Sequence, residues 1–256
     1  MAAPNIEAAH AFTTRLGGVS SGIFESLNLG LSVGDDRADV MRNYAAVCGF
    51  LGIATEDIVF SRQVHSARIR VAGRADRGAL FGASACEADG IVTADAGVAL
   101  AVFAGDCAPI LLHDPVAGAV GAVHAGWRGT VADIAGAAVR KMSGEFGCVP
   151  SDVRAAIGPC ISKCCFETGR DVAGALCAAL PGAEGSCIAP CGGKGDKYMV
   201  DIKEANRLLL QRAGVRDIEL SDECTSCRCD KYWSHRRTDG KRGSQAAIII
   251  LKGPLQ

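Results

Sequence analysis

The sequence has neither an excess of charge of one sign nor a long apolar run. Its 256 residues include 27 lysines and arginines and 28 aspartates and glutamates, for a formal net charge of -1 at pH 7. A chain this close to neutrality offers no electrostatic basis for binding nucleic acid or an anionic membrane surface, so we expect neither partner. Apolar stretches such as 98–103 are far too short to cross a bilayer. Residues 1–10 lack the basic and apolar segments of a secretory signal, and we therefore expect a cytoplasmic protein.

Histidine is scarce, whereas cysteine is abundant. The chain has five histidines and 13 cysteines. The blue and trinuclear centres of a multicopper oxidase need many imidazole ligands, which five histidines do not supply. An odd number of cysteines without a secretory signal argues against a disulfide framework. We therefore expect mostly reduced thiols, with a few available for metal binding or catalysis.

The pattern of apolar residues predicts one domain that covers residues 1–256. Apolar residues make up 49% of the chain and charged residues 21%, which allows a sizeable core. No repeat, charge block or long linker divides it. Short apolar runs bounded by glycine, proline and aspartate are typical of strands, and they mix with helical periodicity without a regular βαβ period. This favours an α/β (α+β) fold, a single-domain sandwich of mixed β-sheets flanked by helices.

Periodicity and turn residues place the individual elements. We expect strands at 10–14, 58–60, 67–71, 90–93, 98–103, 110–112, 118–123, 153–157, 198–200, 218–220 and 246–251. Helices are expected at 39–51, after Thr130, near 169–180 and after Asp201. Thr130 with Asp133, and Asp201 with Glu204, have the spacing of helix-capping boxes. The glycine-rich stretch 181–197 is expected to be an exposed loop.

Three residues that could bind a metal lie at predicted strand ends or breaks. His65 follows the strand near 60, Cys107 interrupts two apolar runs, and His124 ends the next run. Side chains at such positions can be held rigidly and still be reached. Two imidazoles and one thiolate suit zinc, which keeps a fourth position open in catalytic sites. Their spacing alone favours a core cysteine and hydrogen-bonded histidines over a metal site.

Several motifs resemble the YfiH/laccase-domain family, also called the multicopper polyphenol oxidase or purine nucleoside phosphorylase family. The most specific are Asp106-Cys107 and the run from His124 to Gly129. The matching segments are 12–20, 63–65, 88–93, 106–112, 124–129, 158–161 and 234–237. The chain departs from the family at 239–243, where a Thr-Gly-Arg is usual, so no role is carried over to Lys241 or Arg242.

This resemblance implies a metal-dependent enzyme that has a YfiH-like fold and acts on small molecules. It implies that His65, Cys107 and His124 bind zinc, with copper as the alternative. It also implies phosphorolysis of adenosine, inosine, guanosine and methylthioadenosine to the base and ribose 1-phosphate, and deamination of adenosine at the same site. The expected partners are therefore purine nucleosides and phosphate.

Neighbouring polar residues are candidates for catalysis and substrate binding. Asp106 could exchange a proton or orient a ligand, although starting a turn explains it equally well. Arg128 could bind phosphate together with a helix N-terminus, and Arg15 is a second candidate, with ion pairing as the alternative for both. Trp127 could stack on a base, and Gln63 belongs to the same set of substrate contacts.

Other functions compete with this one. The first is a copper-dependent, laccase-like polyphenol oxidase, against which the few histidines argue. The second is a metal-independent cysteine hydrolase that pairs Cys107 with His124. The third is a non-catalytic binding domain.

A further group of cysteines lies near the end of the chain. Cys224, Cys227 and Cys229 look like half of a structural zinc site. Completing it would need Cys160, Cys164 or Cys165. The sequence favours reduced, partly buried thiols over a second metal.

Overall fold

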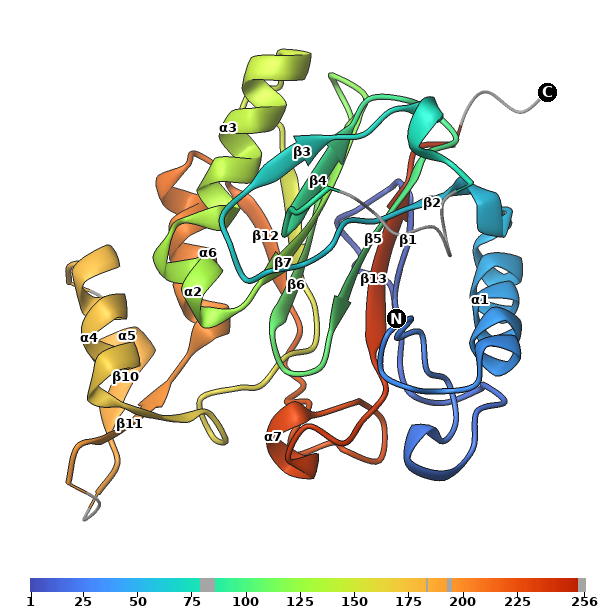
Figure 1. Ribbon diagram of the computed structural model, residues 1–256. Helices are drawn as coiled ribbons and strands as arrows, with labels where there is room; N and C mark the ends of the chain where they lie inside the picture. Colours follow the sequence, from blue (N-terminus) through green and yellow to red (C-terminus); the bar gives the residue numbers. More distant parts are fainter. Residues whose placement is uncertain (79–85, 183, 193–194, 253–256) are drawn as a thin grey trace.

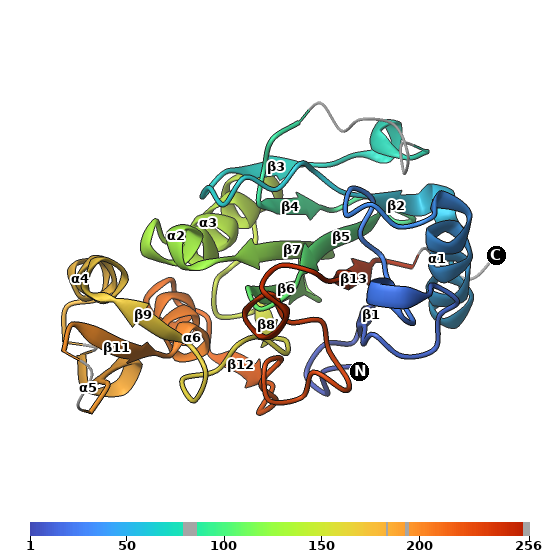
Figure 2. The ribbon, with the colours of Figure 1, turned by 60° about the horizontal axis from the view of Figure 1, so that its bottom comes forward.

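Two β-sheets face each other at the centre of the molecule (Figures 1 and 2). The structure is a computed structural model that describes residues 1–78, 86–182, 184–192 and 195–252. The larger sheet has the strand order β12 (Asp217–Leu220), β8 (Arg154–Ile157), β6 (Ala108–Asp114), β7 (Ala119–Ala125), β4 (Gly90–Thr93) and β3 (Ile69–Val71). The smaller one has the order β1 (Ala9–Phe12), β13 (Gln245–Ile250), β5 (Ala99–Ala104) and β2 (Ile58–Val59).

Helices cover the outer faces of both sheets and complete a layered sandwich. Helix α1 (Arg37–Leu51) packs on the four-stranded sheet. Helices α3 (Ile134–Phe146) and α6 (Ile202–Arg212) pack on the six-stranded sheet. Between the sheets lie fully buried side chains that include Leu100 of β5 and Leu111 of β6. Burying such a side chain contributes about 1.5–3 kcal/mol, so this apolar layer fixes how the sheets stack.

Both sheets are mixed, as the sequence predicted. Strands β12 and β8, β3 and β4, and β2 and β5 pair in parallel, and the remaining pairs are antiparallel. The long β6–β7 hairpin turns at Asp114, whose Oδ1 accepts hydrogen bonds from the N–H groups of Val116 and Ala117. Every expected strand is found, with ends shifted by at most two residues. The mixed α/β sandwich is confirmed.

The helix expected after Thr130 is in fact two helices. Helix α2 (Trp127–Val131) contains Thr130, and α3 begins after Asp133. Asp133 has a left-handed backbone, with φ of 58°, which breaks the helix, and its side chain accepts from Gly136 N to cap α3. The Thr130 hydroxyl instead donates to Gly126 O. The predicted capping box at Thr130 is therefore wrong, because the turn at Asp133 ends one helix and starts another.

The expected loop at 181–197 is also wrong in part. The described residues there include α5 (Glu184–Cys187) and β10 (Ile188–Pro190). Strand β10 pairs with β11 (Lys197–Val200), which in turn pairs with β9 (Glu167–Gly169) in a third, small sheet beside α4 (Arg170–Ala179). Glycine content hid this strand because its pairing partner, not its own residues, stabilises it.

The remaining elements are short. They are the 3-10 turns η1 (Gly22–Phe24), η2 (Thr55–Asp57) and η3 (Arg74–Asp76), and helix α7 (His235–Thr238). Asp201 caps α6 by accepting from Glu204 N, as its spacing predicted. Among the helices of the described residues, none combines the length and apolar character needed to cross a bilayer.

Candidate metal centre

Cys107 lies where the chain crosses from one sheet to the other. The β5–β6 connection leaves the four-stranded sheet, and Cys107 immediately precedes β6 of the six-stranded sheet. His124 lies near the end of β7 and pairs with Pro109 of β6, while His65 lies between β2 and β3. Topology therefore brings three residues that are far apart in the sequence to one edge of the sandwich.

The three side chains converge as the sequence predicted. Cys107 Sγ and a ring nitrogen of each histidine all lie within 4.8 Å of one another. Cys107 Sγ is 3.9 Å from His65 Nε2, and the two imidazole rings meet edge to face with centroids 4.9 Å apart. We call these residues the His–Cys–His cluster. His124 is buried and His65 is exposed, so the cluster is packed against the protein on one side and open to solvent on the other.

Asp89 holds the two histidines of the cluster in place. The backbone N–H groups of Val64, His65 and Ser66 all donate to its carboxylate, over 2.7–3.1 Å. Three donors wrapped round one anion hold His65 in a left-handed conformation, with φ of 59°, that a non-glycine residue rarely adopts. Asp89 directly precedes β4 and is fully buried, so the sheet fixes this anchor.

The same carboxylate fixes the tautomer of His124. Asp89 Oδ1 lies 2.9 Å from His124 Nδ1, so that Nδ1–H donates to the carboxylate and Nε2 remains for a ligand. Burial would raise the pKa of Asp89, but hydrogen bonds from His124 and Ser66 hold this pKa well below its usual range. The carboxylate is therefore ionised at neutral pH.

Cys107 and His124 stabilise each other's charged forms. Burial would raise the pKa of the Cys107 thiol, but the nearby His124 and His65 rings lower it to about 6. Burial would likewise lower the pKa of His124, whereas the charges of Cys107 and Asp89 raise it to about 9. The geometry thus favours a thiolate at Cys107, the form that binds metals or acts as a nucleophile.

Gly126 leaves the space that the cluster needs. A Cβ atom at this position would lie 2.9 Å from His65 Cδ2 and 3.1 Å from Cys107 Sγ. A side chain here would displace two members of the cluster. This explains the glycine within the run from His124 to Gly129.

Asp106 is fully engaged in hydrogen bonds that hold the turn before Cys107. Its backbone has φ of 102°. Oδ1 accepts from the Thr225 hydroxyl at 2.6 Å, and Oδ2 accepts from Arg236 N at 2.6 Å. Both oxygens are thus bound by distant segments of the chain, one of them helix α7. This arrangement favours an orienting role for Asp106 over proton transfer.

Gln63 and Arg15, two of the predicted substrate contacts, form hydrogen bonds with backbone groups. The Gln63 side-chain amide donates to Phe103 O and accepts from Phe103 N, both at 2.7 Å. It therefore clamps the loop before His65 to the end of β5. The Arg15 guanidinium donates to the carbonyls of Glu25 and Cys229 and lies 4.1 Å above the Trp233 ring.

Trp127 and Arg128 form the first turn of α2, directly after the cluster. The Arg128 guanidinium lies 4.3 Å above the Trp127 ring, and its side chain is exposed. A helix that began only after Thr130, as expected, would leave Arg128 before it; this is wrong, because α2 begins at Trp127. A helix this short provides no N-terminal anion site, so Arg128 would bind an anion through its side chain alone.

Sequence reasoning missed Asp89 and Arg242. A buried acid immediately before a strand, in the matching segment 88–93, was the available signal for Asp89. Arg242 packs its guanidinium against Gly105, where a Cβ would lie 2.2 Å from its Cζ. Burial lowers the pKa of Arg242, while the charges of Asp106 and Cys107 raise it. Because Arg242 stands where the family motif is altered, only the fold reveals that it borders the turn before Cys107.

Comparison with known proteins agrees with this architecture. Residues 9–252 match the sequence model of the multi-copper polyphenol oxidoreductase laccases. The chain belongs to this family, as the motifs predicted. It is 41% identical over 253 residues to purine nucleoside phosphorylase YlmD of Geobacillus stearothermophilus, a match that covers 97% of this chain and 92% of that protein. A purine nucleoside phosphorylase of Deinococcus radiodurans is 40% identical and covers 97% of this chain and 91% of its own.

Solved structures of the family share the fold. The crystal structure of YlmD from Geobacillus stearothermophilus has a TM-score of 0.91 at 41% identity, covering 98% of this chain and 94% of that one. The crystal structure of the hypothetical protein YfiH from Bacillus licheniformis has a TM-score of 0.90 at 38% identity, covering 95% and 92%. These likenesses extend over both sheets and the helices that flank them.

Proposed function

We propose that this chain is a metal-dependent purine nucleoside phosphorylase that acts at the His–Cys–His cluster and also deaminates adenosine there. The convergence of His65, Cys107 and His124 at an open edge of the fold is the observation that carries the proposal. Relatives that match nearly the whole chain bear the name purine nucleoside phosphorylase. The proposed substrates are adenosine, inosine, guanosine and methylthioadenosine, with phosphate.

The donor set of the cluster fits zinc. One thiolate and two imidazoles are ligands that zinc prefers, and a fourth position is left for water or substrate. Asp89 leaves His124 Nε2 free for the metal by engaging Nδ1. Zinc, when bound, supplies a Lewis acid that makes water nucleophilic at neutral pH. Copper accepts similar ligands, and element analysis of untagged protein distinguishes the two.

The chain's own residues would bind and orient the substrates. Asp106 positions Cys107 through the bonds to Thr225 and Arg236. Arg128 is the cation that we assign to phosphate, because its side chain is exposed, whereas the Arg15 guanidinium donates to backbone carbonyls. The exposed face of the cluster lets a nucleoside approach from solvent.

Product analysis tests this proposal directly. Incubation with adenosine should release adenine only when phosphate is present, and inosine and ammonia with or without it. Cys107→Ser should abolish both reactions, whereas the matched control Cys177→Ser on α4 should retain them. Base release that is independent of phosphate, or full activity in Cys107→Ser, would contradict the proposal.

Phosphate binding by Arg128 has its own test. Arg128→Ala should raise the KM for phosphate by about tenfold or more, because a charge-assisted hydrogen bond is lost. Deamination, which uses no phosphate, should change little. Arg140→Ala, an exposed arginine of α3, is the control. An equal loss of both reactions in Arg128→Ala would argue against a phosphate contact.

The thiolate character of Cys107 supports one alternative, a metal-independent cysteine hydrolase. The neighbouring His124 lowers the pKa of Cys107 to about 6, as a nucleophilic cysteine requires. Activity that resists chelators, together with covalent labelling of Cys107 by an amide or ester substrate, would favour this alternative. Loss of activity with chelator and its recovery with zinc would favour the phosphorylase.

A further inference from the structure

Four cysteines from two distant loops converge away from the His–Cys–His cluster. Cys164 and Cys165 lie between β8 and β9, whereas Cys224 and Cys227 lie between β12 and α7. Their four sulfur atoms all lie within 4.8 Å of one another. We call these residues the four-cysteine cluster. Cys229 and Cys160, which the sequence also put forward, are not part of it.

The spacing of the sulfur atoms fits a single tetrahedral ion. The sulfur–sulfur distances are 3.8 Å between Cys164 and Cys165, 3.6 Å between Cys164 and Cys227, and 3.4 Å between Cys165 and Cys227. A tetrahedral zinc with Zn–S bonds of about 2.3 Å sets its sulfurs about 3.8 Å apart. A disulfide requires about 2.05 Å. The cluster is thus spaced for a shared cation rather than for bonded sulfurs.

A backbone N–H group of one loop holds the Cys224 sulfur of the other. The Ser162 N–H donates to Cys224 Sγ at 3.3 Å. This bond joins the β8–β9 loop, which contains Ser162, directly to the β12–α7 loop.

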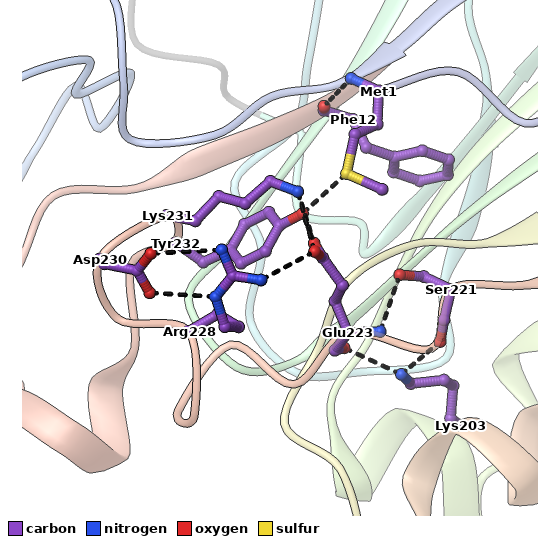
Figure 3. Close-up of polar contacts among 9 residues, drawn as sticks. All are labelled: Met1, Phe12, Lys203, Ser221, Glu223, Arg228, Asp230, Lys231 and Tyr232. Carbon is purple, nitrogen blue, oxygen red and sulfur yellow. Dashed lines mark hydrogen bonds and ion pairs between the residues drawn. The ribbon is translucent and has the colours of Figure 1, made fainter.

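The loop that carries Cys224 and Cys227 is fixed by polar contacts before and after it (Figure 3). Glu223 accepts from Lys231 at 2.9 Å and also from the Tyr232 hydroxyl. The buried Lys203 of α6 donates to the carbonyls of Ser221 and Glu223 at 2.5 and 3.0 Å. The positions of the two cysteines are consequently set without help from the cluster itself, as a preorganised metal site requires.

We propose that Cys164, Cys165, Cys224 and Cys227 bind one structural zinc ion. Four thiolates around one zinc form a closed site, which leaves no position for substrate. In the absence of a cation, four thiolates this close would repel one another, and the ion removes that repulsion. Zinc also joins the β8–β9 loop to the β12–α7 loop, two segments separated by more than fifty residues.

Hydrogen bonds connect the four-cysteine cluster to the turn before Cys107. Thr225, between two of its cysteines, donates to Asp106 Oδ1 at 2.6 Å. Arg236, whose N–H bonds Asp106, donates from Nη1 to Cys165 O at 3.1 Å. The structural ion would therefore brace Asp106 and, through it, Cys107. This last step rests on the proposed function, whereas the metal site itself does not.

Metal stoichiometry tests the site independently of activity. Untagged protein purified with zinc should carry one equivalent that is lost in Cys227→Ser and in Cys164→Ser. The control Cys229→Ser, in the same loop, should retain it. His65→Ala should leave this equivalent in place, so failure of the His–Cys–His cluster to bind metal would be recognised separately. Equal zinc content in Cys227→Ser and the parent protein would overturn the proposal.

Cobalt substitution identifies the ligands. Reconstitution of Cys107→Ala with cobalt should give the strong near-ultraviolet charge-transfer band of a four-thiolate site, and Cys227→Ser should weaken it. Because Cys107→Ala keeps all four cysteines of the cluster, its spectrum tests the site even if a variant of the cluster itself fails to fold. Absence of the band in folded Cys107→Ala, or a disulfide among the four cysteines in protein that has not been treated with oxidant, seen as a mass two hydrogens below that of the reduced chain, would refute the site.

Discussion

Asp89 is the residue on which the geometry of the His–Cys–His cluster most depends. It accepts hydrogen bonds from His124 Nδ1 and from three consecutive N–H groups at His65. A single buried carboxylate thereby sets the tautomer of one histidine and the backbone of the other. Although Asp89 is not a member of the cluster, its replacement should therefore weaken metal binding there.

Asp89→Asn is expected to weaken metal binding at the cluster by about 10- to 100-fold, the range found when partners of ligating histidines are lost. The side-chain amide nitrogen of this variant would face the N–H groups that now donate to the carboxylate, and the tautomer of His124 would no longer be fixed. Competition with a chromophoric chelator measures the change. Asp95→Asn, an exposed aspartate after β4, provides the control. Unchanged affinity in folded Asp89→Asn would contradict this role.

At the scale of elements, single glycines determine where helices continue and where they end. Gly174 lies in the middle of α4 with open space around its Cα, while Gly147 ends α3 with φ of 70°. Neither site would crowd a methyl group. The two positions therefore isolate backbone conformation from packing.

Gly174→Ala should stabilise the protein by about 0.5–1 kcal/mol, because alanine loses less backbone entropy in a helix. Gly147→Ala should destabilise it by about 1 kcal/mol, because an L side chain is strained in the left-handed region. Urea unfolding of both variants measures the difference. Shifts of the same sign would mean that packing, and not backbone conformation, decides the outcome.

At the scale of the whole molecule, folding buries His10 and favours its neutral form. Ala3 N donates to His10 Nε2 at 2.7 Å, and His10 Nδ1 lies 2.7 Å from Ala8 O, to which it donates. Burial lowers the pKa of His10 from 6.5, against a smaller opposing effect of the bond to Ala8. The unfolded chain therefore binds a proton at this site before the folded chain does.

This shift makes stability depend on pH. The contribution of His10 is fully present above pH 6.5 and is lost as the pH falls below it towards the lowered folded pKa, since protons favour the unfolded state there. His10→Gln should flatten the fall in unfolding free energy with acid and leave the slope above pH 6.5 unchanged. Urea titrations across this range provide the measurement. If the unfolding free energy of the two proteins falls equally with acid, protonation of His10 is not coupled to folding.

The sequence by itself determined the strands, the family and the identity of the cluster. Short apolar runs bounded by glycine and aspartate predicted every strand of the two large sheets, because burial and turn formation are local requirements. Metal binding by His65, Cys107 and His124 stays a prediction, as does the single domain. What the motifs could supply were residue types, since imidazole and thiol chemistry can be identified without coordinates.

Only the tertiary structure decided which side chains meet. The partnership of Asp89 with His124, the packing of Arg242 against Gly105, and the meeting of Cys164 with Cys227 all join segments far apart in the chain. Sequence spacing carries no information on such distances, because strand order and sheet stacking set them. The break at Asp133 was missed for a related reason: a left-handed residue is chosen by the packing of the two helices it separates.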